Sequence, residues 1–528
     1  MMDLTTGLIG HWPLADDCKD LSNAGNHGSN HGVRFTGQEG AVFDGRASFI
    51  EAPGSPSLRP GAGDFSIAVW AHTDERLDDV PGDILSKYDP ATRTGFNLSL
   101  RNCAGVTAAQ SSYRHLHFGV DAGRIDPAWT DRGRPGNNLR VYSLIVYEGQ
   151  LYAGTFEHGA DEAGHLYRYS GGTRWIDCGS PDRCNTVASL AVYSGKLYAG
   201  SSRYKAGGSA LPDSPNQNPG GNMFRYEGGK EWTPCGHLEG ADSVAGMAVY
   251  RGDLYAIPLY SQGVFRYEGG TKWAFCGTPG KRLMSLTVFN GHLYGAGNEG
   301  EGRGGVYRYE GGTAWTRTGD QPGVTQVYSF AAHEGRLYVG TWPEGTVFRY
   351  EGGEAWTNCG RLGQEKEVMA MMVYNGKLYA GTLPLAEVYR YDGGTTWTRT
   401  GQLDTTPDVT YRRVWSMAVY QGKLFGGTLP SGHVYSLEAG KSVTYDHELR
   451  PGWRRLAAVR QGDRLKLFVD GRPVATSSPF SPSDYDLSND RPLRIGFGPH
   501  DHFNGRLRDL RIYSRALADA EVKGLYGG

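Results

Sequence analysis

The stretch VYNGKLYAG at residues 373–381, followed by VYRYDGGTTW at 388–397, decides how this chain folds. Both pieces alternate aromatic or β-branched residues with small or polar ones, which is the pattern of half-buried β-strands. The N-G pair and the D-G-G triplet are turn signals that reverse the chain between strands. One copy therefore predicts two consecutive β-hairpins, whose strands we name A, B, C and D in chain order.

The same pair of elements recurs through the middle of the chain. Further copies of the first element are VYEGQLYAG (146–154), VYSGKLYAG (192–200), VYRGDLYAI (249–257), VFNGHLYGA (288–296), AHEGRLYVG (332–340) and VYQGKLFGG (419–427). The second element places a tryptophan in strand D, and its copies carry Trp175, Trp232, Trp273, Trp315, Trp356 and Trp397. Their spacings are 57, 41, 42, 41 and 41 residues, and a period near 42 is the length of a four-stranded β-propeller blade.

The ends of the repeat predict how the propeller closes. There are seven A–B hairpins, but only six of them are followed by a tryptophan strand. We expect the missing strand before the first hairpin, around Trp129, where it would complete the blade of the last hairpin. Closure with strands from both ends removes the exposed sheet edge. The prediction is a seven-bladed β-propeller over residues 126–437.

The repeat also resembles two known propeller families. N-G-K-L-Y at 375–379 is similar to the kelch repeat, and R-Y-D-G-G-T-T-W at 390–397 is similar to the Asp-box of sialidases. It departs from both, because A-G-T mostly replaces the kelch di-glycine and Arg390 replaces the Asp-box serine. The resemblance therefore implies propeller geometry and transfers no catalytic residue.

Residues 1–125 and 438–528 lack the repeat and resemble, taken together, the laminin-G-like (concanavalin A-like) jelly roll. The matching stretches include AVFDGRASFIEAPGSPSL (41–58), GWRRLAAVRQGDRLKLFVDGRPVA (452–475) and FNGRLRDLRIYSRALADAEVKGLY (503–526). In that family these motifs follow one another within one domain. The predicted fold class is therefore all-β, with the propeller inserted into a concanavalin A-like β-sandwich near Gly123 and Gly440. Only ALADAEVKGLY near the C-terminus has a helical pattern.

Composition limits the partners. Lys and Arg total 54 against 56 Asp and Glu, a net charge of -2, which argues against bulk attraction to nucleic acid or anionic membrane. No apolar run reaches the ~18 residues that a membrane helix needs. No signal peptide is visible, and the compartment stays open: the family resemblance suggests an extracellular protein, whereas cysteines at equivalent repeat positions cannot pair and suggest a cytoplasmic one. The oligomeric state is not readable from the sequence.

Candidate ligand-binding residues come from the mouth of the propeller channel. The positions at the start of each strand A, together with the long loop at 201–222, supply Arg140, Tyr142, Arg282, Tyr328, Glu367, Arg413, Trp415, Arg203 and Tyr204. Guanidinium groups bind carboxylates, sulfates or phosphates with two hydrogen bonds, and aromatic faces suit sugar rings. The pattern favours an acidic glycan; the alternative is that these arginines pair with neighbouring acids on the rim.

Three functions are consistent with this sequence. The first is a carbohydrate-recognition protein with a glycan or polysaccharide as its partner. The second is a polysaccharide-active hydrolase or lyase with its site at the channel mouth, although no spacing singles out a catalytic pair. The third is a protein-interaction scaffold, since propellers serve all three roles.

The laminin-G-like resemblance further implies Ca²⁺ binding. The candidate oxygen ligands are Asp20, Asn26, Asp44 and Asp509, hard ligands of the kind that Ca²⁺ prefers. The alternative is that these residues cap turns and pair with arginine. The H-D-H stretch at 500–502 is expected to be an exposed turn and not a transition-metal site.

Overall fold

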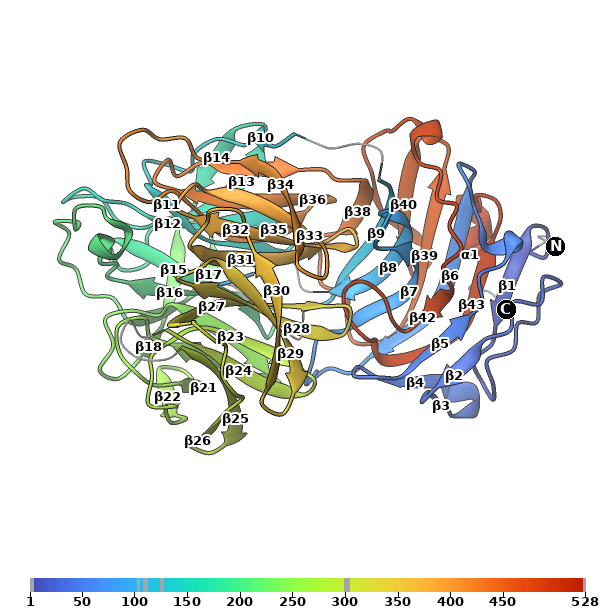
Figure 1. The fold of residues 1–528 in the computed structure, drawn as a ribbon, viewed down its shortest axis with the longest axis horizontal. Helices are drawn as coiled ribbons and strands as arrows, with labels where there is room; N and C mark the ends of the chain where they lie inside the picture. The colour runs from blue at the N-terminus through green and yellow to red at the C-terminus, as the bar shows by residue number, and fades with distance from the viewer. Residues whose placement is uncertain (1–3, 102–104, 108–112, 124–127, 299–303, 526–528) are drawn as a thin grey trace.

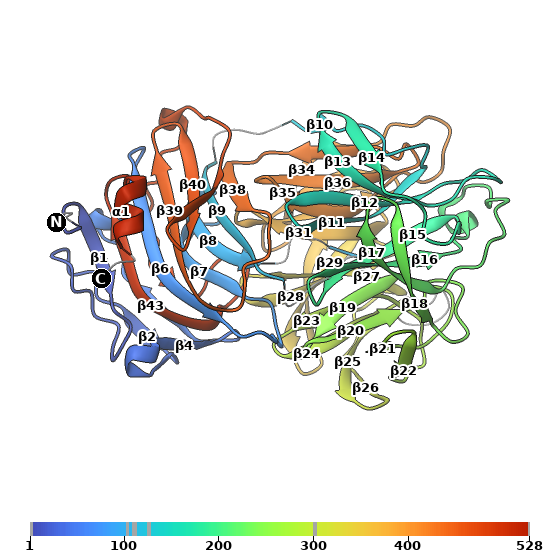
Figure 2. The same ribbon diagram turned by 180° about the vertical axis from the view of Figure 1, so that it is seen from behind.

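The computed structural model describes residues 4–101, 105–107, 113–123, 128–298 and 304–525. The chain is all-β, and its only described α-helix is the short α1 (Asp519–Gly524), inside the stretch predicted to be helical. Sheets built from residues 130–437 form one part of the molecule (Figure 1). Sheets built from both ends of the chain form the other part. Figure 2 shows the molecule from behind, with the two ends of the chain at the edge of this part that lies away from the propeller.

The repeat folds into antiparallel four-stranded units in a propeller arrangement. In the first two units, strands A to D are β11 (Arg140–Tyr147), β12 (Gln150–Phe156), β13 (Leu166–Gly171) and β14 (Arg174–Asp177), and then β15 (Thr186–Tyr193), β16 (Lys196–Ser202), β17 (Asn222–Gly228) and β18 (Glu231–His237). In the third and fourth units they are β19 (Gly246–Tyr250), β20 (Asp253–Ile257), β21 (Phe265–Gly269) and β22 (Lys272–Phe275), and then β23 (Leu283–Phe289), β24 (His292–Gly297), β25 (Gly305–Gly311) and β26 (Ala314–Arg317). In the fifth and sixth units they are β27 (Gln326–His333), β28 (Arg336–Trp342), β29 (Thr346–Gly352) and β30 (Ala355–Arg361), and then β31 (Glu367–Tyr374), β32 (Lys377–Leu383), β33 (Glu387–Gly393) and β34 (Thr396–Gln402).

The last hairpin is completed from the other end of the repeat. Strands β35 (Arg413–Tyr420), β36 (Lys423–Leu429) and β37 (Val434–Leu437) form one sheet with β10 (Thr130–Asp131), which directly follows Trp129. Thr130 lies opposite Ser436 in this sheet. The first two units, β11–β14 and β15–β18, are joined into one eight-stranded sheet by a single residue pair, Phe156 and Thr186.

The A–B turns have the geometry that their sequence predicts. Tyr147 and Gln150 pair across a two-residue turn in which Glu148 has φ 46° and Gly149 has φ 75°. Two successive left-handed residues are the mark of the hairpin turns that match strand twist, and glycine reaches this conformation without a steric penalty.

The strand-D tryptophans connect neighbouring units. Trp232 Nε1 donates to the carbonyl oxygen of Cys178, three residues after Trp175 of the preceding unit, at 3.2 Å. The same bond joins Trp175 to Arg132, Trp273 to Cys235, Trp315 to Cys276, Trp356 to Thr318 and Trp397 to Cys359. Trp129 Nε1 donates to the Thr400 side chain at 3.4 Å, again three residues after the tryptophan of its neighbour.

The second part of the molecule is a sandwich of two sheets. One has the order β3 (Arg34–Phe35), β4 (Ala41–Asp44), β43 (Asn504–Tyr513), β6 (Phe65–Thr73), β39 (Gly452–Gln461), β40 (Arg464–Val469) and β41 (Arg472–Thr476), with β1 (Leu8–Trp12) beside β43. The other has the order β2 (Ser29–His31), β5 (Phe49–Ala52), β42 (Leu493–Ile495), β7 (Gly82–Asp89), β8 (Thr94–Arg101), β9 (His115–Ala122) and β38 (Lys441–Tyr445). The two sheets enclose one apolar core that includes Trp12, Phe43, Phe65, Phe96 and Phe118.

Both sheets combine strands from the two ends of the chain. β6 lies between β43 and β39, and β9 pairs antiparallel with β38 so that Val120 is opposite Lys441. The points near Gly123 and Gly440 therefore lie side by side. The predicted boundary at residues 125 and 126 lies outside the described residues.

The sandwich covers the propeller face that carries the A–B turns. Asn375 Nδ2 in one such turn donates to the carbonyl oxygens of Val120 at 3.1 Å and Ala439 at 2.8 Å, and the Gly291 amide in another donates to Asp79 Oδ2 at 3.1 Å. Because every strand A runs toward its A–B turn, the residues that begin the A strands lie on the opposite face. The candidate ligand residues are therefore on the face that points away from the sandwich.

The same interface corrects the expectation for residues 500–502. These residues are buried and not an exposed turn: His500 is 6% exposed and Asp501 1%. His500 Nδ1 lies 2.9 Å from Asp83 Oδ1, and its Nε2 lies 2.7 Å from Arg101 Nη1. The sequence of the turn could not reveal this burial, because propeller residues that are distant in sequence help to cover it.

Candidate functional site

An irregularity in the A strands turns large side chains into the channel. The pairing register shifts between Val141 and Ser143, and equivalent shifts occur in β27 and β35. The residues within these shifts are Tyr142, Tyr328 and Trp415, and all three belong to one apolar cluster at the centre of the propeller. A bulge re-aims the side chain of its extra residue, so the distortion builds an aromatic lining for the channel.

Arg140, the first residue of β11, lies against this aromatic lining. Its guanidinium carbon is 3.1 Å from the ring centroid of Trp415, 3.8 Å from that of Tyr142 and 4.4 Å from that of Tyr204. The side chain is fully buried. Contacts of this kind stabilise a buried cation by about 2 kcal/mol or more when water is excluded.

Among the described residues, however, the Arg140 guanidinium has no hydrogen-bond acceptor. Its Nε, Nη1 and Nη2 atoms make no hydrogen bond of ordinary geometry within the described residues, and neither does Trp415 Nε1. Burial lowers the pKa of Arg140, and the nearby Arg413 acts in the same direction. Buried donors are nearly always satisfied in proteins, so these groups need acceptors from outside the described side chains.

Arg413 and Glu367 form a buried ion pair beside Arg140. Arg413 Nε lies 3.4 Å from Glu367 Oε1, and its Nη2 lies 3.5 Å from Oε2. Burial raises the pKa of Glu367, although Arg413 and Arg140 oppose this shift. With two arginines and one glutamate, the cluster holds an excess of one positive charge. The alternative that these arginines pair with neighbouring acids therefore holds for Arg413, whereas the described residues offer Arg140 no such acid.

The long loop covers part of the mouth. Tyr204 is held by Asn185, which accepts from its amide at 2.8 Å and donates to its carbonyl oxygen at 3.0 Å, so that the Tyr204 ring lies over Arg140. Further along the loop, the fully buried Ser209 Oγ accepts from Arg413 Nη1 at 3.0 Å. The loop thus closes the site above Arg140.

The structure brings together most of the predicted ligand residues. The central cluster contains Arg140, Tyr142, Tyr204, Tyr328, Glu367, Arg413 and Trp415. Arg282 lies half-buried at the rim, where its Nη2 donates to Asn298 Oδ1 at 3.1 Å. Arg203 bonds instead to Gln217 in its own loop.

Residues of the sandwich close the channel from below, which the sequence reasoning missed. Gly105 to Thr107 follow β8 and enter the propeller, where Thr107 Oγ1 donates to the carbonyl oxygen of Tyr142 at 2.8 Å. The Gly105 amide donates to the Met417 carbonyl at 3.1 Å, and Val106 packs into the central cluster. No feature of the short G-V-T stretch distinguishes it from an ordinary loop, so the sequence carried no signal for this role.

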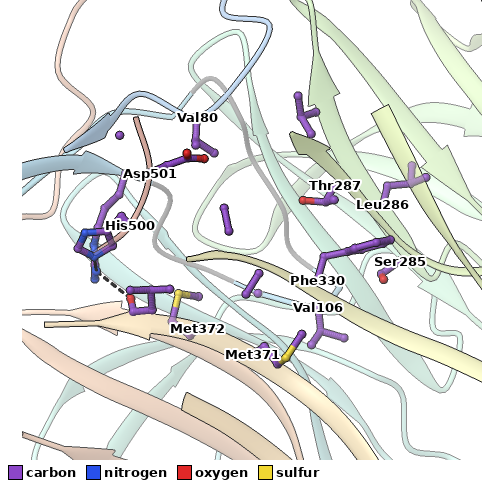
Figure 3. Close-up of a pocket in the computed structure, with 17 residues that line it drawn as sticks. Val80, Val106, Ser285, Leu286, Thr287, Phe330, Met371, Met372, His500 and Asp501 are labelled. Atoms are coloured by element: carbon purple, nitrogen blue, oxygen red, sulfur yellow. Dashed lines mark hydrogen bonds between the residues drawn. The ribbon is translucent and has the colours of Figure 1, made fainter. Parts of the chain in front are cut away.

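A cavity of about 110 Å³ lies between this segment, the A strands and the sandwich (Figure 3). Its walls are mostly apolar and include Phe330, Met371 and Met372, whereas His500 and Asp501 supply polar groups at one end. Burial raises the pKa of Asp501 well above its usual range. The cavity lies at the junction of the propeller and the sandwich, and the segment Gly105 to Thr107 separates it from Arg140.

The four predicted calcium ligands are engaged in local hydrogen bonds. Asp20 accepts from the amides of His11, Ser22 and Asn26, and Asp44 Oδ1 accepts from three amides at 2.9–3.0 Å, which lowers the pKa of Asp44 to about 2 despite partial burial. Asp509 lies between His11 and Arg511, and Asn26 bonds to Ser55 and Ser57. Within the described ranges, no group of three or more His, Cys, Asp or Glu side chains is placed to hold a metal ion. Calcium binding therefore stays a prediction.

One segment of the chain matches a known protein family. Residues 395–523 match the Laminin_G_3 family of the concanavalin A-like lectin/glucanases superfamily. The matched residues begin in β34 of the propeller part and include the sandwich strands β38–β43. A concanavalin A-like domain is therefore present. No curated protein matches the chain. None of the helices in the described residues is long and apolar enough to cross a membrane.

Several solved structures are similar to part of this chain at low sequence identity. A streptogramin B lyase is 12% identical with a TM-score of 0.47, over 59% of this chain and 97% of that one. An inactive virginiamycin B lyase from Staphylococcus aureus with quinupristin is 10% identical with a TM-score of 0.45, over 59% and 99%. A gluconolactonase from Xanthomonas campestris is 14% identical with a TM-score of 0.34, over 60% and 94%.

Proposed function

We propose that this chain is a seven-bladed propeller inserted into a concanavalin A-like sandwich, with the propeller spanning residues 126–437. Five separate four-stranded sheets and one eight-stranded sheet made of two units support this count, since five and two make seven. The indole bonds support it independently, because they run from unit to unit and return through Trp129 to the unit of Trp397. The pairing of β9 with β38 supports insertion into a single sandwich.

We further propose that the protein recognises carbohydrate, with an acidic glycan bound at the channel mouth. The observation that carries this proposal is the fully buried guanidinium of Arg140, which has no acceptor of ordinary geometry within the described residues. A buried, unsatisfied donor group is costly, by about 1–3 kcal/mol for each lost hydrogen bond and more for a charged group. A ligand carboxylate would supply two acceptors and a negative charge.

The surroundings favour a sugar acid over a simple ion. Tyr142, Tyr328 and Trp415 surround the charged groups with buried aromatic surface. Aromatic faces suit the apolar faces of sugar rings, so a sugar ring would pack at the rim beside these residues with its acid group toward the arginines. The excess of one positive charge in the Arg140, Arg413 and Glu367 cluster matches one carboxylate. The described residues of the sandwich cover the propeller face that carries the A–B turns, and the A strands begin on the opposite face.

Titration calorimetry on acidic and neutral oligosaccharides tests this proposal. The double variant Arg140→Ala with Arg413→Ala should abolish acidic-glycan binding, whereas Arg203→Ala should leave it unchanged because Arg203 faces Gln217. Unchanged affinity in the double variant would remove the channel-mouth site. Turnover is tested in the same samples by new reducing ends or by absorbance of unsaturated products, and either signal would favour a hydrolase or lyase.

Calcium binding by the sandwich is a separate proposal from the laminin-G-like resemblance. Its test is the thermal midpoint of the protein with added Ca²⁺ and with a chelator, because a ion that binds only the folded state raises the midpoint. Asp44→Asn should remove the shift. An equal midpoint under both conditions would end the proposal.

A further inference from the structure

We propose that the channel-mouth site takes one terminal acidic sugar unit, held in a corner formed by Trp342 and Tyr411, and not an internal stretch of polysaccharide. This inference rests on the proposed function and adds the position of the acidic unit in the glycan. It also assigns two residues that would determine specificity.

The first argument is that the site is closed from two sides. Below Arg140, the segment Gly105 to Thr107 plugs the channel and bonds to Tyr142 and Met417. Above it, Tyr204 lies over the guanidinium, and Ser209 is fully buried against Arg413. A polysaccharide therefore cannot thread the channel, and a chain that lies across the rim would not bring an internal carboxylate down to Arg140.

The second argument is that the side away from the loop offers an aromatic corner. Trp342 ends β28, and its ring centroid lies 6.5 Å from that of Tyr411 with the planes at 89°. Both residues are only half-buried, and Trp342 packs against the central cluster. Two rings at right angles present two apolar walls, which fit the face and the edge of a single sugar ring.

The third argument is that the corner adjoins the charged groups. The Arg413 guanidinium carbon is 5.9 Å from the Tyr411 centroid and 5.3 Å from that of Trp415. A sugar ring in the corner would thus place a carboxylate toward Arg413, which shares Trp415 as a neighbour with Arg140. Glu344, two residues after Trp342, is directed to Arg361 at 3.4 Å, so its charge is partly compensated.

The experiment compares two trisaccharides of equal composition, one with its glucuronate at the non-reducing end and one with glucuronate between two neutral sugars. Calorimetry with the full chain should give at least tenfold tighter binding of the terminal-acid trisaccharide. Equal or tighter binding of the internal-acid trisaccharide would overturn the inference. If both bind equally and binding is lost in the Arg140→Ala, Arg413→Ala variant, the proposed function survives and only the terminal-unit inference fails.

Variants of the corner separate its contribution from that of the charges. Trp342→Ala should weaken the terminal-acid trisaccharide by about tenfold, the upper range for one aromatic contact, while acetate should bind as it does to the unmodified protein. Tyr411→Ala provides a second variant should the first fold poorly, and Trp453→Ala changes a half-buried tryptophan on the sandwich as the control. Full affinity in both corner variants would overturn the inference. Absence of binding by glucuronate and by both trisaccharides would overturn it together with the proposed function.

Discussion

Replacing Glu367 by glutamine tests whether three charges at the channel mouth act as one site. Glu367 is 1% exposed and pairs with Arg413 at 3.4 Å. At that separation, the attraction between unit charges is about 5 kcal/mol for an effective dielectric constant near 20. Removing one partner of a buried pair costs about 3–5 kcal/mol, because the other charge stays buried without compensation. We expect the lower value, about 3 kcal/mol, because a glutamine can still accept a hydrogen bond.

The same substitution should strengthen anion binding. With Glu367 neutral, Arg140 and Arg413 lose the only acid of the cluster among the described residues, so a carboxylate ligand meets two positive charges without repulsion from Glu367. The variant should therefore have a lower thermal midpoint than the unmodified protein, and glucuronate should restore more of its stability. Scanning calorimetry with and without glucuronate measures both effects.

The matched control is Glu344→Gln, which removes an acid from the same face. Its side chain is 65% exposed, and its contact with Arg361 is a surface pair expected to contribute less than about 1 kcal/mol. If the two variants unfold at the same temperature, or if glucuronate stabilises them equally, then Glu367 and the two arginines do not form a coupled site and the reasoning is wrong.

Three further predictions follow from individual contacts. Because burial raises the pKa of Glu367, this side chain takes up a proton more readily as the pH falls, and its repulsion of a carboxylate ligand weakens. Affinity for the ligand should therefore increase from pH 7 to pH 5, where the ligand is still ionised. Calorimetric titrations of the Glu367→Gln variant should show no such increase. Burial lowers the pKa of Lys87 to about 8, against 10.5 in the unfolded chain, so between these pH values the unfolded state binds more protons than the folded state. The free energy of unfolding should therefore rise between pH 8 and 10.5 by up to about 3 kcal/mol. Urea unfolding measures this rise, and the Lys87→Met variant should lack it. Trp129→Phe loses the hydrogen bond to Thr400 and should lower the free energy of unfolding by about 1 kcal/mol. Trp315→Phe loses the equivalent bond to Cys276 and should lower it by the same amount. A negligible loss for Trp129→Phe alone would argue against closure of the propeller through Trp129.

The elements of the repeat could be predicted because their signals are local. The E-G pair at residues 148 and 149 requires two left-handed residues, and the structure has them at φ 46° and 75°. The alternation in VYRY and the following di-glycine likewise determine a hairpin within ten residues. Even the pairing of the Trp129 segment with the last hairpin followed from counting incomplete copies.

What could not be predicted depends on contacts between distant segments. Nothing in G-V-T at residues 105–107 indicates that it enters the propeller, since its partners Tyr142 and Met417 are far away in sequence. The H-D-H turn is buried by a neighbouring part of the fold for the same reason. Within the long loop, adjacent residues differ: Tyr204 reaches Arg140, whereas Arg203 turns back to Gln217, and only the loop's own hydrogen bonds decide between them.

The repeat itself shows that the fold does not require Arg140. Equivalent positions before strand A in the next two units hold Thr186 and Ser243, which are also fully buried but have satisfied hydroxyl groups. Thr186 Oγ1 donates to Asn185 at 2.9 Å, and Ser243 Oγ accepts from the Leu259 amide at 2.7 Å. A small hydroxyl residue therefore meets the structural need of this position at little cost, whereas a guanidinium brings a desolvated charge and unsatisfied donors. Natural proteins tolerate such local costs chiefly where function needs them, which supports the proposal that Arg140 binds a ligand.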